Sequence, residues 1–191
     1  FTRCLTDNGY DIVHSPLVQD ENGIWRMDYA DMEKHLAEEH IHAAILCSPH
    51  NPVGRAWTAD ELRRMGELCV QYGTLIISDE IHSDLMLFGH KHIPMATVSE
   101  EIAANTITCT SATKTFNLAG LQAATLMFPN EKLRDTYQAF WKSMDVHRNN
   151  SFSLVAVEAA FRYGEEWLEQ LLAHLERNVK YVEDYLKENI P

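Results

Sequence analysis

The sequence contains no run of about 18 apolar residues, and it does not open with a charged segment followed by an apolar one. We therefore expect neither a membrane-spanning helix nor a secretory leader. Basic residues are also scarce, because 16 Lys and Arg stand against 28 Asp and Glu and give a formal net charge of -12. A protein with this charge repels polyanions, so we expect no nucleic-acid partner and no attraction to anionic membranes.

Cysteine is scarce as well, with four in 191 residues and none in the paired spacing of a metal site. Cys47 and Cys109 lie inside apolar segments, which predicts buried, reduced thiols rather than disulfides. Reduced thiols favour a cytoplasmic protein. The glycine patterns of a P-loop and of a dinucleotide site are also missing.

The apolar residues, 46% of the chain, are arranged as in an α/β protein. Four short segments are almost continuously apolar and rich in Ile, Leu and Thr, as expected of strands buried on both faces. Helical patterns over 28–40 and 58–72 alternate with them, and the second opens with a capping box from Thr58 to Glu61 and stops at Gly73. We predict a mainly parallel sheet with strands at residues 43–47, 74–78, 106–110 and 123–128.

The chain changes character after residue 128, where the pattern becomes almost entirely helical. Apolar residues recur at helical spacing, which predicts helices over 131–144, over 153–163 and from 165 to about 189. No repeat, low-complexity tract or flexible linker interrupts the sequence, so we predict no domain boundary within residues 1–191.

A lysine, Lys114, follows the third predicted strand in the sequence Ser111-Ala112-Thr113-Lys114. An enzyme that uses pyridoxal 5'-phosphate (PLP) needs such an amine to form an imine with the cofactor aldehyde and to move the Cα proton of the substrate. The pKa of a free lysine is near 10.4, so we expect Lys114 in a semi-buried site that lowers it. The alternative is a solvated lysine in a loop.

Asp79 follows the second predicted strand, residues 74–78. A buried carboxylate at this place is costly without a cationic partner. The pyridine nitrogen of PLP must stay protonated to act as an electron sink, and an adjacent anion keeps it so. At about 4 Å and an effective dielectric near 20 this attraction is of order 4 kcal/mol. The alternative is an aspartate that caps a helix.

Three further residues are candidates for contacts with the same cofactor. Asn51, held in Ser48-Pro49-His50-Asn51-Pro52-Val53-Gly54, can donate its amide to the ring oxygen, and His82 can lie beside that oxygen. Ser111 can bind the phosphate through its hydroxyl. The alternatives are an ordinary turn for Asn51 and a structural histidine for His82. We interpret Glu80 and Asp84 as solvated charges.

The order Asn51-Pro52-x-Gly54, Asp79, then Ser111-x-x-Lys114 resembles the class I/II aminotransferase family of fold-type I PLP enzymes. Residues 78–82, 112–121 and 163–168 are similar to its cystathionine β-lyase, or carbon–sulfur lyase, branch. The resemblance implies a three-layer α/β sandwich in which Lys114 binds PLP, Asp79 partners the pyridine nitrogen, Asn51 and His82 lie by the ring oxygen and Ser111 contacts phosphate. It also implies a homodimer and an amino-acid substrate.

Two positions depart from the wider family, which often has tyrosine in place of His82 and arginine in place of Gln122. Both departures resemble the lyase branch. The family also has an N-terminal segment and a C-terminal small domain that we do not find in this sequence, so residues 1–191 are expected to be the central part of an incomplete large domain.

The activity implied by the resemblance is cleavage of the C–S bond of cystathionine or a cysteine S-conjugate to thiol, pyruvate and ammonia. An aminotransferase is the nearest alternative, because the same site can pass the amino group to a keto acid. A non-catalytic fragment or a regulatory, protein-binding relative that keeps the fold is the third.

Overall fold

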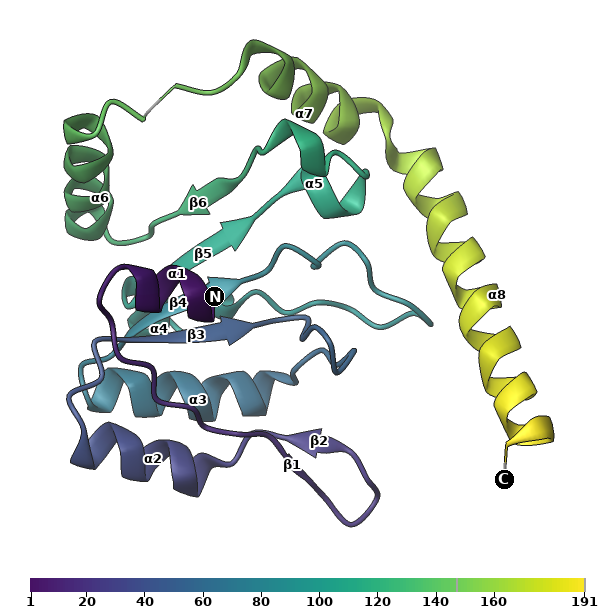
Figure 1. Cartoon of the computed structure of the whole chain (residues 1–191), viewed down its shortest axis with the longest axis horizontal. Coiled ribbons are helices and arrows are strands. Elements are labelled where there is room, and N and C mark those ends of the chain that lie inside the picture. Colours follow the sequence, from purple (N-terminus) through teal and green to yellow (C-terminus); the bar gives the residue numbers. More distant parts are fainter. Residues whose placement is uncertain (147, 191) are drawn as a thin grey trace.

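The computed structural model of the chain describes residues 1–146 and 148–190, and its centre is a four-stranded sheet in the order β3-β4-β5-β6 (Figure 1). Strands β3, β4 and β5 are parallel, and β6 runs antiparallel to β5. The predicted α/β fold with a mainly parallel sheet is therefore confirmed. The strands are β3 (Ala43–Cys47), β4 (Leu75–Asp79), β5 (Thr106–Thr110) and β6 (Thr125–Met127).

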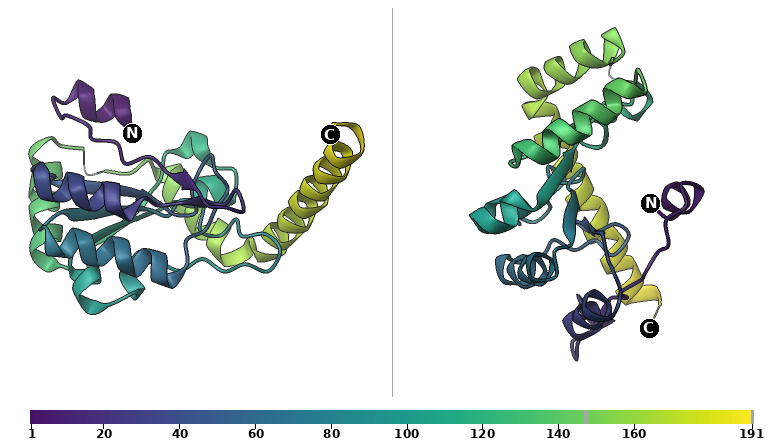
Figure 2. Two further views of the ribbon diagram at one scale, coloured as in Figure 1. Left: turned by 90° about the horizontal axis from the view of Figure 1, so that it is seen from below. Right: turned by 90° about the vertical axis from the view of Figure 1, so that its left-hand side faces the viewer.

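One face of this sheet is fully covered by helices. Leu46, Ile76 and Thr106, on β3, β4 and β5, are at most 5% exposed. Leu46 and Ile76 pack with apolar residues such as Leu62 and Met65, both at most 2% exposed, in a single core. The covering elements, seen on one side of the sheet in Figure 2, are α2 (Tyr29–Glu38), α3 (Ala59–Gln71), α4 (Glu100–Ala104) and the 3-10 turn η1 (Met95–Thr97).

Helix α3 begins and ends as its sequence predicts. The Thr58 hydroxyl accepts a hydrogen bond from the Glu61 backbone at 3.3 Å, and the Glu61 carboxylate accepts one from the Thr58 backbone at 2.9 Å. Tyr72 is its C-terminal cap, and Gly73 follows with a φ of +68°, a conformation that favours glycine. The predicted capping box and glycine stop are confirmed.

The opposite face is less completely covered. Cys47, Asp79 and Cys109 lie side by side on it, because they are register partners in β3, β4 and β5. The α6 helix (Glu131–Ser143) reaches this face through Tyr137, whose ring centroid lies 5.1 Å from that of Phe128. Helix α1 (Thr2–Asp7) stands off the same side in both views of Figure 2 and contains no buried residue. Helices therefore flank both faces of the sheet.

The remaining helices lead away from the sheet. Helix α7 (Ser151–Tyr163) is followed by α8 (Glu165–Asn189), which runs past the ends of the parallel strands (Figure 1). The Phe116 ring, after the short helix α5 (Ala112–Thr115), lies 5.6 and 5.9 Å from those of Phe161 and Trp167. These ring contacts join the end of α5 to helices α7 and α8.

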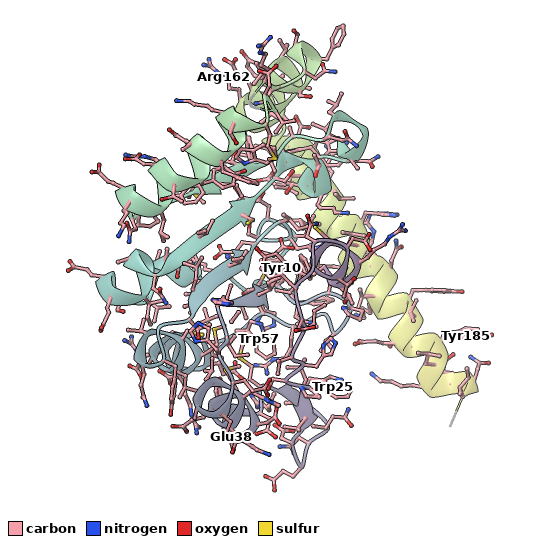
Figure 3. The ribbon with its side chains drawn as sticks, turned by 60° about the vertical axis from the view of Figure 1, so that its left-hand side comes forward. Tyr10, Trp25, Glu38, Trp57, Arg162 and Tyr185 are labelled. Carbon is pink, nitrogen blue, oxygen red and sulfur yellow. The ribbon has the colours of Figure 1, made fainter. Side chains whose placement is uncertain are left out.

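Two smaller features complete the described chain. A two-stranded ribbon, β1 (Val18–Gln19) with β2 (Trp25–Arg26), precedes α2, and a 3-10 turn, η2 (Ala119–Leu121), precedes β6. Trp57 lies inside the body and Tyr185 projects from α8 (Figure 3). Within residues 1–146 and 148–190, no helix is both long and apolar enough to cross a bilayer.

Candidate active site

The candidate residues gather at the carboxyl edge of the three parallel strands. The Ser48 backbone donates to the Asp79 carbonyl at 2.9 Å, and the Glu80 backbone donates to the Cys109 carbonyl at 2.8 Å. These bonds hold the three strand ends level with one another. In open α/β sheets ligands bind outside this edge, and the loops that carry the predicted site residues all leave from it.

Asp79 is partly buried between two thiols at this edge. Its carboxylate accepts a hydrogen bond from the Ile81 backbone at 3.3 Å, and no described Lys, Arg or His lies within ion-pair distance. Burial first, and the Asp79 charge in addition, raise the pKa of the Cys109 and Cys47 thiols. For Cys47 a hydrogen bond from the Asn51 backbone opposes the shift. Asp79 is therefore an anion without a cationic partner among the described residues.

Asn51 and His82 are brought together by the fold, although 31 positions separate them (82 − 51). Both line a cavity of about 550 Å³ that opens between the loops after β3 and β4 and helix α8, which contributes Val179. Asn51 is exposed, and His82 is partly buried. The lining includes apolar side chains such as Leu85 and Phe88, but Asp79, Ser111 and Lys114 are not part of it.

Lys114 lies in the four-residue helix α5, directly after β5, and its side chain is exposed. The described residues therefore do not provide the semi-buried environment expected for this lysine. Its neighbour Thr115 is fully buried and donates to the Asp84 carboxylate at 2.8 Å. This bond ties the helix that carries Lys114 to the segment that carries His82. Asp84, expected to be solvated, is exposed but also holds this contact.

Ser111 is the N-terminal cap of α5. Its hydroxyl accepts a hydrogen bond from the Thr113 backbone at 3.0 Å and donates to the Ala123 carbonyl at 2.6 Å. A hydroxyl has a single proton to donate. To donate to a phosphate oxygen, the Ser111 hydroxyl therefore has to give up its hydrogen bond to the Ala123 carbonyl.

The loop that holds Asn51 is fixed by a charged network that the sequence reasoning did not foresee. The His50 backbone donates to the Arg55 carbonyl at 2.6 Å, which closes a tight turn around Asn51. The Arg55 guanidinium donates to the Glu61 carboxylate at 2.7 Å and lies 4.7 Å from the Trp57 ring centroid. The capping glutamate of α3 thus also anchors the Asn51 turn. In the sequence, the position of Glu61 in the capping box was the signal from which its role could have been noticed.

Glu80 corrects one expectation. Predicted as a solvated charge, it is 2% exposed, and its carboxylate accepts from the Ser78 hydroxyl at 2.9 Å and from the Met95 backbone at 3.0 Å. Its second oxygen lies 2.7 Å from His92 Nε2. The physical reason is alternation along the strand, since Ile76, Ser78 and Glu80 point to the covered face. That period of two was the signal in the sequence.

Comparison with known proteins gives the chain a family. The family described as "Aminotransferase class I and II" matches residues 1–190. The chain is 39% identical over 191 residues to cystathionine beta-lyase PatB of Bacillus subtilis, covering 100% of this chain and 49% of that protein. It spans about half the length of the curated relatives it matches.

Solved structures agree with this match. A PLP-bound protein from Clostridium difficile 630, described as an aminotransferase, has a TM-score of 0.95 and 47% identity over 100% of this chain and 49% of its own. The PLP-bound C-S lyase from Staphylococcus hominis has a TM-score of 0.92 and 34% identity over 100% of this chain and 47% of its own. With almost every residue inside the family match, this chain belongs to the aminotransferase class I and II family.

Proposed function

We propose that this chain carries the PLP-binding centre of a carbon–sulfur β-lyase, which cleaves cystathionine or a related cysteine S-conjugate to thiol, pyruvate and ammonia. The observation that carries the proposal is the convergence of three separate segments at one edge of the parallel sheet: the turn with Asn51, the end of β4 with Asp79 and helix α5 with Lys114. Relatives named cystathionine beta-lyase and C-S lyase support the reaction type.

The residues at this edge fit PLP. Asp79 is a partly buried carboxylate with no cationic partner among the described residues, and a protonated pyridine nitrogen would supply that partner. Asn51 and His82 line one cavity, where an amide and an imidazole can bond the ring oxygen. Ser111, at the start of α5, offers a hydroxyl to the phosphate once it turns from Ala123.

Each residue then has a specific task. Lys114, exposed on α5, provides the amine that holds the cofactor and takes the Cα proton of the substrate. Asp79 keeps the ring nitrogen protonated, and Asn51 holds the ring in place. When bound, PLP supplies the electron sink that stabilises negative charge at Cα. Loss of the Cα proton lets the Cβ–S bond break, so that the sulfur leaves as thiolate and water releases pyruvate and ammonia.

The experiment is turnover of L-cystathionine by the native protein that contains this chain, without any keto acid. We expect pyruvate and thiol in equal amounts, and we expect Lys114→Ala to lower the rate by at least about 10³-fold, because it removes both the anchor and the base. Lys142→Ala, on exposed α6, is the matched control and should leave the rate unchanged. Equal rates for the Lys114→Ala and native proteins would exclude this site.

An aminotransferase is the second candidate, favoured by the 47% identity to a protein described as one. The same residues serve that reaction, because both reactions begin with removal of the Cα proton. In transamination the Cβ–S bond stays intact and the amino group passes to a keto acid. Turnover that requires a keto-acid acceptor and releases no thiol would identify it.

A non-catalytic, protein-binding relative is the third candidate. The exposed side chain of Lys114 and the internally bonded hydroxyl of Ser111 favour it. Absence of the visible absorption band of bound cofactor in the native protein would favour this candidate.

We also propose a homodimer in the cytoplasm. Four free cysteines, two of them partly buried beside Asp79, are compatible with a reducing compartment. Light scattering of the native protein tests the dimer, because a single-copy mass would contradict it.

A further inference from the structure

The buried carboxylate of Glu80 ties together three separate points of the chain. It accepts from Ser78 within β4, from the backbone of Met95 in η1, and faces His92 between them. Both acidic oxygens are used, and the side chain is 2% exposed. The His92 side chain is 9% exposed, so this pair is shielded from solvent. A buried carboxylate is costly without such partners, which makes the arrangement specific.

The contacts with His92 and Met95 close the segment from Ile81 to His92 into a loop whose two ends are fixed. Inside that loop the chain makes short turns, with the Ser83 backbone donating to the Glu80 carbonyl and the Leu85 backbone to the His82 carbonyl, both at 3.0 Å. Two further bonds hold it from outside, from Thr115 to the Asp84 carboxylate at 2.8 Å and from the Phe88 backbone to the Glu176 carboxylate at 2.6 Å. His82 is in the first of these turns. Its position therefore depends on where Glu80 holds the ends of the loop, together with the bond of Asp84 to Thr115.

Glu80 also lies next to the carboxylate that faces the candidate site. Asp79 and Glu80 are consecutive residues that point to opposite faces of the sheet, and the Glu80 backbone donates to Cys109 of β5 at 2.8 Å. If the Glu80 side chain loses its partners, this strand end is no longer held to His92 and Met95, and backbone pairing with Ser48 and Cys109 is left to fix the direction of Asp79. Asp79 and His82 would then move together.

We propose that Glu80 is a positioning residue, which acts through the backbone to hold Asp79 and His82 in the arrangement that binds the cofactor. This inference rests on the proposed PLP site. It assigns a function to a carboxylate that touches neither substrate nor cofactor, and it makes His92 its partner.

The test compares Glu80→Ala with Glu80→Gln in the native protein. Glu80→Gln keeps an oxygen that accepts from Ser78 and Met95, whereas Glu80→Ala removes every side-chain bond of this residue. We expect Glu80→Ala to weaken PLP binding roughly tenfold, as lost hydrogen bonds to a buried charge imply, and Glu80→Gln to stay within about threefold. His92→Ala should fall between them and replaces Glu80→Ala if that variant does not fold. PLP affinity is measured by titration of the visible cofactor band.

A second measurement does not need the cofactor. In the cofactor-free protein, amide hydrogen exchange of residues 81–95 should be faster in Glu80→Ala and near normal in Glu80→Gln. Thr106→Val is the matched control, because it removes a fully buried hydroxyl, bonded to the Ile102 carbonyl at 2.7 Å, at the opposite end of β5. It should lower the thermal midpoint without changing PLP affinity or exchange in residues 81–95.

The two measurements separate the possible failures. Native protein that binds no PLP would refute the proposed function, while faster exchange in Glu80→Ala would still support the loop anchor. Unchanged PLP affinity in Glu80→Ala, or exchange no faster than in Thr106→Val, would overturn the positioning role.

Discussion

Residues 27–112 and the helices that flank them differ in how many of their side chains are buried. Every buried apolar side chain of the described residues lies between Met27 and Ala112, whereas α1, α6 and α8 contain no buried residue. On α7 even large side chains are exposed, such as Phe152 at 77% and Tyr163 at 79%. The difference shows that the sheet edge with Asp79 stands on a dense core, while Lys114 lies just beyond its end.

The largest difference between the core and the flanking helices is expected in the reactivity of two thiols, Cys69 and Cys4. Burial raises the pKa of Cys69, on α3, from its ordinary value of 9.0 to about 12, and the residue is 0% exposed. At a pH below both values its thiolate is about a thousandfold scarcer than that of an ordinary thiol, equivalent to about 4 kcal/mol. Alkylation of the native protein, followed by mass spectrometry, should therefore modify exposed Cys4 on α1 long before Cys69. Similar rates for both would contradict a closed core.

Core packing should give the next largest effect. Leu62→Ala on α3 removes a side chain that is 0% exposed, so we expect the free energy of unfolding to fall by about 2–5 kcal/mol. Leu186→Ala on α8, where the side chain is 45% exposed, makes the same chemical change and should cost less than about 0.5 kcal/mol. Denaturant unfolding of the native protein measures both. A loss at Leu186 as large as at Leu62 would mean that another part of that protein covers α8.

A smaller difference is expected in how acid changes the contributions of two glutamates, Glu61 and Glu158, to the stability of the fold. Burial would raise the pKa of Glu61, but hydrogen bonds from the Thr58 backbone and from the Arg55 and Arg26 guanidinium groups outweigh it and lower the pKa below its ordinary 4.5. A carboxyl of lowered pKa stabilises the fold above 4.5, and this stabilisation is lost as the pH falls through the folded-state value.

The measurement is the thermal midpoint of the native protein and of Glu61→Gln as the pH is lowered from neutral to below 4.5. The difference between them should be largest at neutral pH and shrink on acidification. Glu158→Gln on α7, whose pair with Arg162 is more than 60% exposed, should behave like the native protein throughout. A constant difference across the pH range for Glu61→Gln would refute the assigned cause.

Elements with strong local signals were predictable from the sequence. Strands β3 and β5 have the predicted bounds, because continuous apolar segments leave little choice of register, and α3 carries its own start signal at Thr58. The ribbon of β1 and β2 was missed because each strand has two residues, too few to show a period.

The candidate site was less predictable. Position after a strand was enough to select Asp79 and Asn51 as candidates. The environment of Glu80 depends on His92, twelve positions away, and the hydroxyl direction of Ser111 on Ala123, also twelve positions away. Such contacts form only when the chain is folded, so no local pattern specifies them. Their chemical roles remain predictions.

Two adjacent acids, the last residue of β4 and the residue after it, give the sheet a further property. Because side chains alternate, sliding β4 by a single position against its neighbours would exchange Asp79 and Glu80 between the open and the covered face. An anion would still face the site, but Asp79 would then be directed at Met95 with a side chain one methylene shorter. The choice of which acid meets the ligand is thus made by backbone pairing, at Ser48 with Asp79 and at Glu80 with Cys109.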